Sequence, residues 1–166
     1  AQDDFWQEGG SYTGEISAKM LKNLGVEYVI IGHSERRRLG ETDEIVNKKL
    51  KTALRNELIP IVCLGERVRD GNFKDFLKKQ TLNTFAGLSR DELGKCMIAY
   101  EPVWAISSNL GARPDIPEES IKAIKIIRET ISKLDGEEIG MPILYGGSVT
   151  SKNVAEFVGQ KEIDGV

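Results

Sequence analysis

Short apolar runs alternate with helix-like stretches along the chain, and this alternation limits the possible folds more than any other feature. The runs have the length of strands and lie at residues 26–31, 59–64, 96–100, 142–145 and 163–166. The stretches between them have helical spacing of apolar residues or a capping residue, and lie at 18–24, 42–54, 73–85, 117–134 and 150–158. Strands that alternate with helices predict a parallel α/β sheet with right-handed crossovers.

The length of the chain bears on how that sheet is built. With 166 residues, one domain over residues 1–166 is expected, and an open, doubly wound sheet of five strands is favoured. A closed eight-stranded barrel usually needs about 250 residues. Both architectures place functional groups at the carboxyl ends of the strands. The last apolar run stops without a following turn or helix, which suggests that the chain is truncated.

Composition excludes several classes of function. The chain is 40% hydrophobic and 30% charged, with a formal net charge of -3, so it gives no reason to expect nucleic acid or an anionic membrane as a partner. It has no apolar stretch of membrane-spanning length and no signal-peptide pattern at its start, so we expect a cytoplasmic protein. Cys63 and Cys96 lie in apolar runs without metal-ligand spacing and are expected to be buried free thiols rather than a disulfide.

Polar side chains follow the predicted strands, at the end where function is expected. They are His33, Glu35, Glu66, Glu101 and Ser148. Pro102 prevents the strand before Glu101 from continuing as an internal strand. A long loop rich in turn-forming residues follows, and loops of this length are often lids or binding loops. Glu101 is therefore a candidate general base, and an ordinary solvated carboxylate is the alternative.

Three segments together resemble the triosephosphate isomerase family, and they occur in that family's order. They are Val-Ile-Ile-Gly-His-Ser-Glu-Arg-Arg at 29–37, Ala-Tyr-Glu-Pro-Val-Trp-Ala-Ile at 99–106 and Tyr-Gly-Gly-Ser-Val at 145–149. Segments at 14–17, 61–66 and 163–166 extend the match over essentially the whole chain. The resemblance implies an incomplete (β/α) TIM barrel, with about five of eight strands, corresponding to the family's fourth to eighth. It places the family's catalytic lysine and asparagine before residue 1, and its glycine-rich phosphate contacts after residue 166.

The resemblance also implies roles for individual residues. Glu101 resembles the base that removes a proton beside a carbonyl, and His33 the neutral imidazole that polarises the carbonyl oxygen, a pairing for which this enzyme is a standard example. A structural histidine is the alternative for His33. Glu35 resembles a carboxylate near the active site, and a salt bridge to Arg36 or Arg37 is its alternative. Cys63 resembles a residue packed behind the base.

Backbone amides are expected to hold the substrate phosphate, because converging N–H groups suit a doubly charged anion. Ser107, Gly147 and Ser148 match that role, with an ordinary strand-to-helix turn as the alternative for the last two. The chain departs from the family in the loop after Glu101, where Ser107-Ser108-Asn109 replaces the usual Gly-Thr-Gly and the segment through Asp115 is enlarged. We therefore expect altered loop closure.

The remaining expectations concern partners and activity. Tyr12 and Thr13 resemble the loop that enters a partner subunit, which implies a homodimer, and an ordinary surface loop is the alternative. The implied reaction interconverts dihydroxyacetone phosphate and glyceraldehyde 3-phosphate in glycolysis and gluconeogenesis, without metal or organic cofactor. We expect these 166 residues alone to have little or no activity. A non-catalytic phosphate-binding or assembly module is the alternative function.

Overall fold

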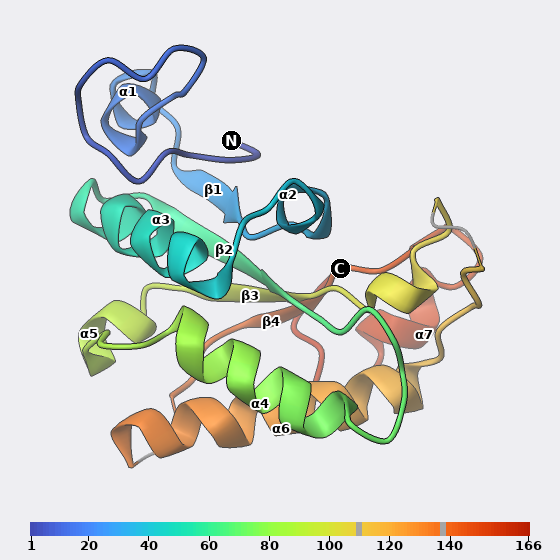
Figure 1. Cartoon of the computed structure of the whole chain (residues 1–166). Coiled ribbons are helices and arrows are strands. Elements are labelled where there is room, and N and C mark those ends of the chain that lie inside the picture. The colour runs from blue at the N-terminus through green and yellow to red at the C-terminus, as the bar shows by residue number, and fades with distance from the viewer. Residues whose placement is uncertain (109–110, 137–138) are drawn as a thin grey trace.

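Four strands form one parallel sheet whose spatial order equals the chain order (Figure 1). The computed structural model describes residues 1–108, 111–136 and 139–166. The strands are β1 (Tyr28–Ile31), β2 (Ile59–Leu64), β3 (Met97–Tyr100) and β4 (Ile143–Tyr145). A doubly wound sheet reverses its strand order at a switch point. The observed order has no such reversal among the described residues, so the expectation of an open, doubly wound sheet is wrong, and the sheet is consistent with part of a TIM barrel.

The fifth expected strand is reduced to an isolated bridge. Gly165 pairs with Leu144 in parallel, and the N–H of Asp164 donates to the carbonyl of Ile143 over 2.9 Å. The N–H of Tyr145 likewise donates to the carbonyl of Gly165 over 2.9 Å. Residues 163–166 thus begin to add to the sheet at the β4 edge, but too few residues pair to form a strand.

Seven α-helices and one 3-10 helix are described: α1 (Ala18–Asn23), α2 (Ser34–Arg38), α3 (Asp43–Arg55), α4 (Phe73–Thr84), α5 (Arg90–Leu93), η1 (Val103–Ala105), α6 (Pro117–Asp135) and α7 (Val154–Val158). Ser17 and Thr42 cap α1 and α3 through their side chains, as the sequence predicts. α7 begins later than expected, because the N–H of Thr150 donates to Oδ1 of Asn153 and a turn occupies residues 150–153.

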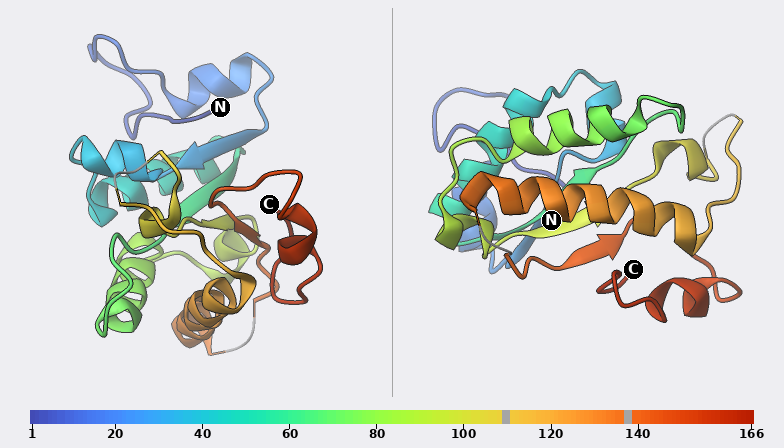
Figure 2. Two further views of the ribbon diagram at one scale, coloured as in Figure 1. Left: turned by 90° about the vertical axis from the view of Figure 1, so that its right-hand side faces the viewer. Right: turned by 90° about the horizontal axis from the view of Figure 1, so that it is seen from below.

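Helices α3, α4 and α6 cover one face of the sheet, and α4 and α6 pack against each other (Figures 1 and 2). The strand side chains on that face are buried: Val29, Ile31, Val62, Leu64, Ile98, Tyr100, Ile143 and Tyr145. The opposite face is also apolar, but most of its side chains are only half-buried: Ile30, Ile59, Ile61, Met97, Ala99 and Leu144. No described helix covers this second face (Figure 2). One apolar face of the sheet is therefore packed against helices, and the other is covered by no described helix.

The carboxyl ends of the strands lie at one end of the sheet, together with α2, η1 and the turn after β4 (Figure 1). The N-terminal segment lies along the other side of β1: the N–H of Ile30 donates to the carbonyl of Ala1 over 2.9 Å, and Phe5 pairs with Ser17. Both cysteines are buried free thiols, as expected. Among the described residues no helix is long and apolar enough to cross a membrane.

Candidate active site

Glu101 lies directly after β3, where two strand ends approach each other closely. Its N–H donates to the carbonyl of Leu64 at the end of β2 over 2.7 Å, and its side chain is 5% exposed. A Cβ atom at Gly65 would lie 1.8 Å from the carbonyl oxygen of Glu101. Glycine is therefore required at residue 65 for the strand ends to meet in this way, and the approach fixes the backbone of Glu101.

The carboxylate of Glu101 is held by three donors from the β1–α2 junction. The N–H of Ser34 donates to Oε2 over 2.9 Å, and Oγ of Ser34 donates to Oε1 over 2.8 Å. Nε2 of His33 lies 3.0 Å from Oε1. The structure thus brings Glu101 and His33 into contact, as the resemblance implies, and adds Ser34. Sequence reasoning missed the role of Ser34, although it lies between the predicted His33 and Glu35.

The backbone of α2 selects one tautomer of a neutral His33 ring. His33 occupies the N-cap position, and its Nδ1 accepts a hydrogen bond from the N–H of Glu35 over 3.3 Å. An accepting Nδ1 has no proton, so the proton of the neutral ring lies on Nε2, which faces Glu101. The ring is 39% exposed and therefore open to a ligand from the cavity. This arrangement suits a neutral donor to a carbonyl oxygen.

Glu35 lies at the cavity rim but does not contact Glu101 directly in any described interaction. Its side chain is 67% exposed, and Oε1 lies 3.7 Å from Arg38. The alternative role of Glu35 was a salt bridge to Arg36 or Arg37. In the described residues these arginines pair with other carboxylates: Arg36 with Asp3 and Glu41, and Arg37 with Asp43. A catalytic role for Glu35 stays a prediction.

The turn after β4 contains two of the candidate phosphate-binding residues, Gly147 and Ser148. The N–H of Ser107 donates to Oγ of Ser148 over 2.8 Å. A Cβ atom at Gly147 would lie 2.2 Å from the hydroxyl oxygen of Tyr145, so glycine lets the turn pass over that ring. A cavity of about 220 Å³ lies between these groups and the Glu101 carboxylate, and is lined by His33, Ser34, Glu35, Arg38, Glu101, Ile106, Ser108, Gly146, Gly147 and Ser148. Gly147 and Ser148 therefore line the same cavity as Glu101, whereas Ser107 lies beside it, bound to Ser148 and lining a neighbouring cavity. Asn109, the third changed loop residue, is outside the described residues.

Glu66, the other strand-end carboxylate, belongs to a buried network away from that cavity. Its Oε1 lies 2.7 Å from Nη1 of Arg69 and accepts hydrogen bonds from the hydroxyl of Tyr100 and Nε1 of Trp104, over 3.0 and 2.9 Å. Burial, followed by the charge of Glu66, raises the pKa of Tyr100 well above its usual value. The network is an anchor for Trp104 and for the loop that Trp104 begins.

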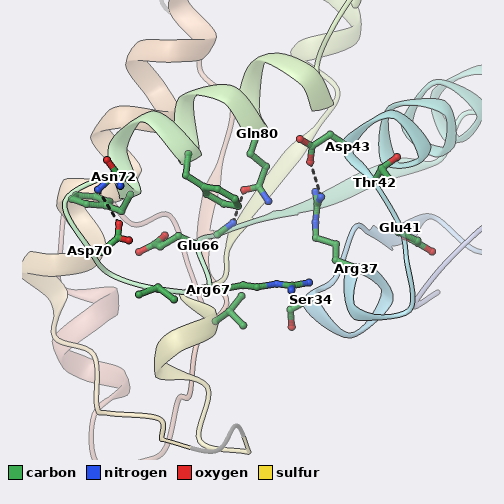
Figure 3. A pocket seen from close by; sticks show the side chains of 15 residues that line it. Ser34, Arg37, Glu41, Thr42, Asp43, Glu66, Arg67, Asp70, Asn72 and Gln80 are labelled. Atoms are coloured by element: carbon green, nitrogen blue, oxygen red, sulfur yellow. Dashed lines mark hydrogen bonds and ion pairs between the residues drawn. The ribbon is translucent and has the colours of Figure 1, made fainter.

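A larger cavity, of about 560 Å³, lies beside the 220 Å³ cavity and is bounded by the α2–α3 connection, the β2–α4 loop and α4 (Figure 3). The N–H of Gly65 donates to Oε1 of Gln80 over 2.9 Å, and Arg37 pairs with Asp43 at 2.7 Å. Ser34 borders both cavities. These contacts fix the loops that support Ser34 and Gly65, which in turn hold Glu101.

A second charged cluster lies under the N-terminal segment and was not foreseen. Nζ of Lys49 lies 2.6 Å from both Asp3 and Glu41, and its side chain is 1% exposed. Asp4 is buried beside it, with no hydrogen-bond partner for either carboxylate oxygen among the described residues. Burial raises the pKa of Asp4 to about 8, against a lowering effect of Lys49. Tyr12 and Thr13, the loop expected to enter a partner subunit, are exposed. The Tyr12 ring lies 4.8 Å from the ring of Phe5, which follows Asp4 in the chain.

No group of histidine, cysteine, aspartate and glutamate side chains in the described ranges is arranged to hold a metal ion.

Comparison with known proteins shows which family this chain resembles over its whole length. A family profile described as triosephosphate isomerase matches residues 1–166. The triosephosphate isomerase of Caldanaerobacter subterraneus subsp. tengcongensis is 48% identical over 99% of this chain and 68% of its own length. Those of Dictyoglomus turgidum and Corynebacterium efficiens are 46% and 48% identical, over 99% of this chain and 68% and 64% of their own lengths.

Proposed function

Because the chain belongs to the triosephosphate isomerase family, we propose that it supplies the acid–base residues of an enzyme that interconverts dihydroxyacetone phosphate and glyceraldehyde 3-phosphate. This isomerisation requires removal of a proton from the carbon beside a carbonyl, and the enediolate that forms has negative charge on oxygen. One group must accept the proton and another must stabilise the oxygen. The observation that supports the proposal is the 3.0 Å contact between Glu101 and His33 at the strand ends.

Glu101 is the base in this proposal. In the described arrangement its carboxylate accepts hydrogen bonds from Ser34 and lies against His33. A bound substrate competes for the Nε2–H of His33, and the carboxylate then turns from Ser34 toward the substrate carbon. Apo-enzyme hydrogen bonds commonly rearrange in this way when the ligand binds.

His33 donates its Nε2–H to the carbonyl oxygen and passes protons between the two oxygens of the enediolate. The hydrogen bond from the N–H of Glu35 keeps Nδ1 free of a proton. Gly147 and Ser148, which line the 220 Å³ cavity with Glu101, bind the phosphate together with the amide of the adjacent Ser107. The Ser107 N–H is already bound to Ser148 Oγ, so it must exchange this partner for a phosphate oxygen.

The test is an isomerisation assay on this chain and on a completed barrel, in which the parts of the Caldanaerobacter relative that the chain does not match are joined to it. We expect little turnover from the chain alone, because one missing preorganised donor costs roughly 3–4 kcal/mol of transition-state stabilisation. The completed barrel is expected to turn over, and His33→Gln to lower kcat more than it raises KM. Near-native turnover by the chain alone would contradict the first expectation.

A phosphate-binding module without catalysis is the alternative function, and the same completed barrel separates the two. Binding of 2-phosphoglycolate, which mimics the enediolate, without turnover in the completed barrel would favour the module. We also propose that the completed protein is a homodimer through the exposed Tyr12–Thr13 loop and acts in the cytoplasm, in glycolysis and gluconeogenesis. Sedimentation of the completed barrel and of its Tyr12→Ser variant tests the dimer: the variant is expected to shift it toward monomer.

A further inference from the structure

The loop between Glu101 and α6 is joined across its base by a contact that the sequence pattern did not indicate. Trp104 lies in η1, before the loop, and Arg113 lies in the segment that leads out of it. The N–H of Arg113 donates to the carbonyl of Trp104 over 3.3 Å. The guanidinium of Arg113 also lies over the indole ring, 4.5 Å from its centroid. Two contacts therefore connect the start and the end of the loop.

The Trp104 side of this connection is firmly anchored. The indole N–H donates to buried Glu66 over 2.9 Å, and Glu66 is in turn paired with Arg69. The Arg113 side is different, because its side chain is exposed and no carboxylate among the described residues pairs with it. Among the described residues, the contact of the Arg113 guanidinium is therefore with the ring of Trp104.

The described parts of the loop are not held by close packing onto the sheet. A cavity of about 460 Å³ lies between described residues of the loop, among them Ser107, Arg113 and Asp115, and the end of β4, where Tyr145 and Ser148 line it. Asp115 is fixed by hydrogen bonds from the hydroxyls of Ser120 and Tyr145. Ser107 is held by the hydrogen bond from its N–H to Oγ of Ser148, and the contacts at the base of the loop limit where Ser107 and Ser108 can lie relative to Glu101.

We propose that Arg113 is a positioning residue that clamps the end of this loop to Trp104 and so sets the position of the Ser107 amide at the phosphate site. A planar guanidinium stacks on an aromatic face, whereas an ammonium group does not match it in shape. The inference rests on the proposed function, in which the Ser107 amide binds a phosphate oxygen. Its test needs neither phosphate nor turnover, so its failure and the failure of the isomerase proposal are distinguishable.

The experiment measures backbone hydrogen exchange and tryptophan emission in the 166-residue chain with Trp6→Phe, which leaves Trp104 as the single tryptophan. Arg113→Met keeps the length of the side chain and removes its charge. An exposed cation–π contact corresponds to a factor of about two to five in an equilibrium. We therefore expect the amides of residues 107, 108 and 113 to exchange about two- to five-fold faster in Arg113→Met, with a changed Trp104 emission. Arg113→Lys should restore part of both.

The matched control is Arg67→Met, which removes an exposed arginine of the β2–α4 loop and is expected to leave both readouts unchanged. The amides of β2 and β3 report on the stability of the whole chain. Unchanged loop exchange and emission in Arg113→Met would overturn the proposal. An equal acceleration in β2 and β3 would also overturn it, because Arg113 would then act on general stability and not on the loop.

Discussion

At the scale of single residues, Asp4 has the least favourable surroundings of the described carboxylates. It is 2% exposed, neither oxygen has a hydrogen-bond partner in the described structure, and its nearest charges are Lys49, Asp3 and Glu41. Its pKa is about 8 in the folded chain, against 3.8 as the usual value. Between these pH values the folded chain binds one more proton than the unfolded chain, so stability from this group is present below about pH 4 and is lost as pH rises to about 8.

We therefore predict that Asp4→Asn removes this pH dependence. One such proton changes the free energy of unfolding by at most about 1.4 kcal/mol per pH unit. Urea unfolding at pH 5 and pH 8 should show the variant gaining stability over the original chain as pH rises. Asp75→Asn, at an exposed residue of α4, changes the same charge without altering a buried group. A stability difference for Asp4→Asn that is the same at both pH values would contradict the prediction.

The two thiols give a second prediction at this scale. Burial, and then the charge of Glu101, raises the pKa of Cys63 above its usual value, and burial raises that of Cys96 to about 12. Because the thiolate is the reactive form, we expect iodoacetamide to modify neither cysteine of the folded chain appreciably at pH 8, and both in urea. Rapid modification of one thiol in the folded chain would show that this thiol is accessible and ionised.

Sequence reasoning predicted which candidate site residues would lie close together but not how they are held. The motif order placed His33, Glu101, Gly147 and Ser148 at one end of the sheet, and the structure brings them around one cavity. It did not predict that Ser34 binds Glu101 through both its N–H and its Oγ. That contact joins residues 67 apart in the chain and depends on the relative placement of β1 and β3. The local sequence pattern does not specify how β1 and β3 are placed relative to each other.

At the scale of elements, the ends of β2 and β3 depend on Gly65. The position of a Cβ at residue 65 is 1.8 Å from the oxygen and 2.5 Å from the carbonyl carbon of Glu101, and both are backbone atoms that cannot turn away. We predict that Gly65→Ala lowers the free energy of unfolding by about 1–3 kcal/mol or more, as overpacking does. Gly71→Ala is the control, since nothing lies within 4 Å of its Cβ position. Equal stability of the two variants in urea would contradict the described strand contact.

The longer elements followed from sequence because their signals are local. Thr42 and the apolar spacing after it determine α3, and Pro117 begins α6. Helices α2 and α5 have only 5 and 4 residues, too few for a periodic pattern to appear. The run at 163–166 is strand-like in sequence but finds one pairing partner, at Leu144. Whether residues 163–166 form a strand depends on pairing with a distant segment and not on local propensity.

At the scale of the whole molecule, one face of the sheet is apolar and is covered by no described helix. The chain spans about two thirds of the length of the relatives it matches. We predict that this face causes self-association, because half-buried apolar side chains lie on it in several adjacent strands. Ile61→Ser, on this face, should reduce association in sedimentation velocity, whereas Val62→Ser, on the covered face, should unfold the chain. Association that is unchanged in Ile61→Ser would assign it to another surface.

The proposed function depends above all on Glu101 as the base of an isomerase, with His33 as its electrophilic partner. General acid–base catalysis contributes roughly 10²–10⁴-fold to a rate. The decisive measurement is kcat for isomerisation of glyceraldehyde 3-phosphate by the completed barrel and by its Glu101→Gln variant, with 2-phosphoglycolate binding as the control for folding. We predict a loss of at least about 100-fold in kcat, with the inhibitor still bound. Unchanged turnover in Glu101→Gln would show that another residue removes the proton.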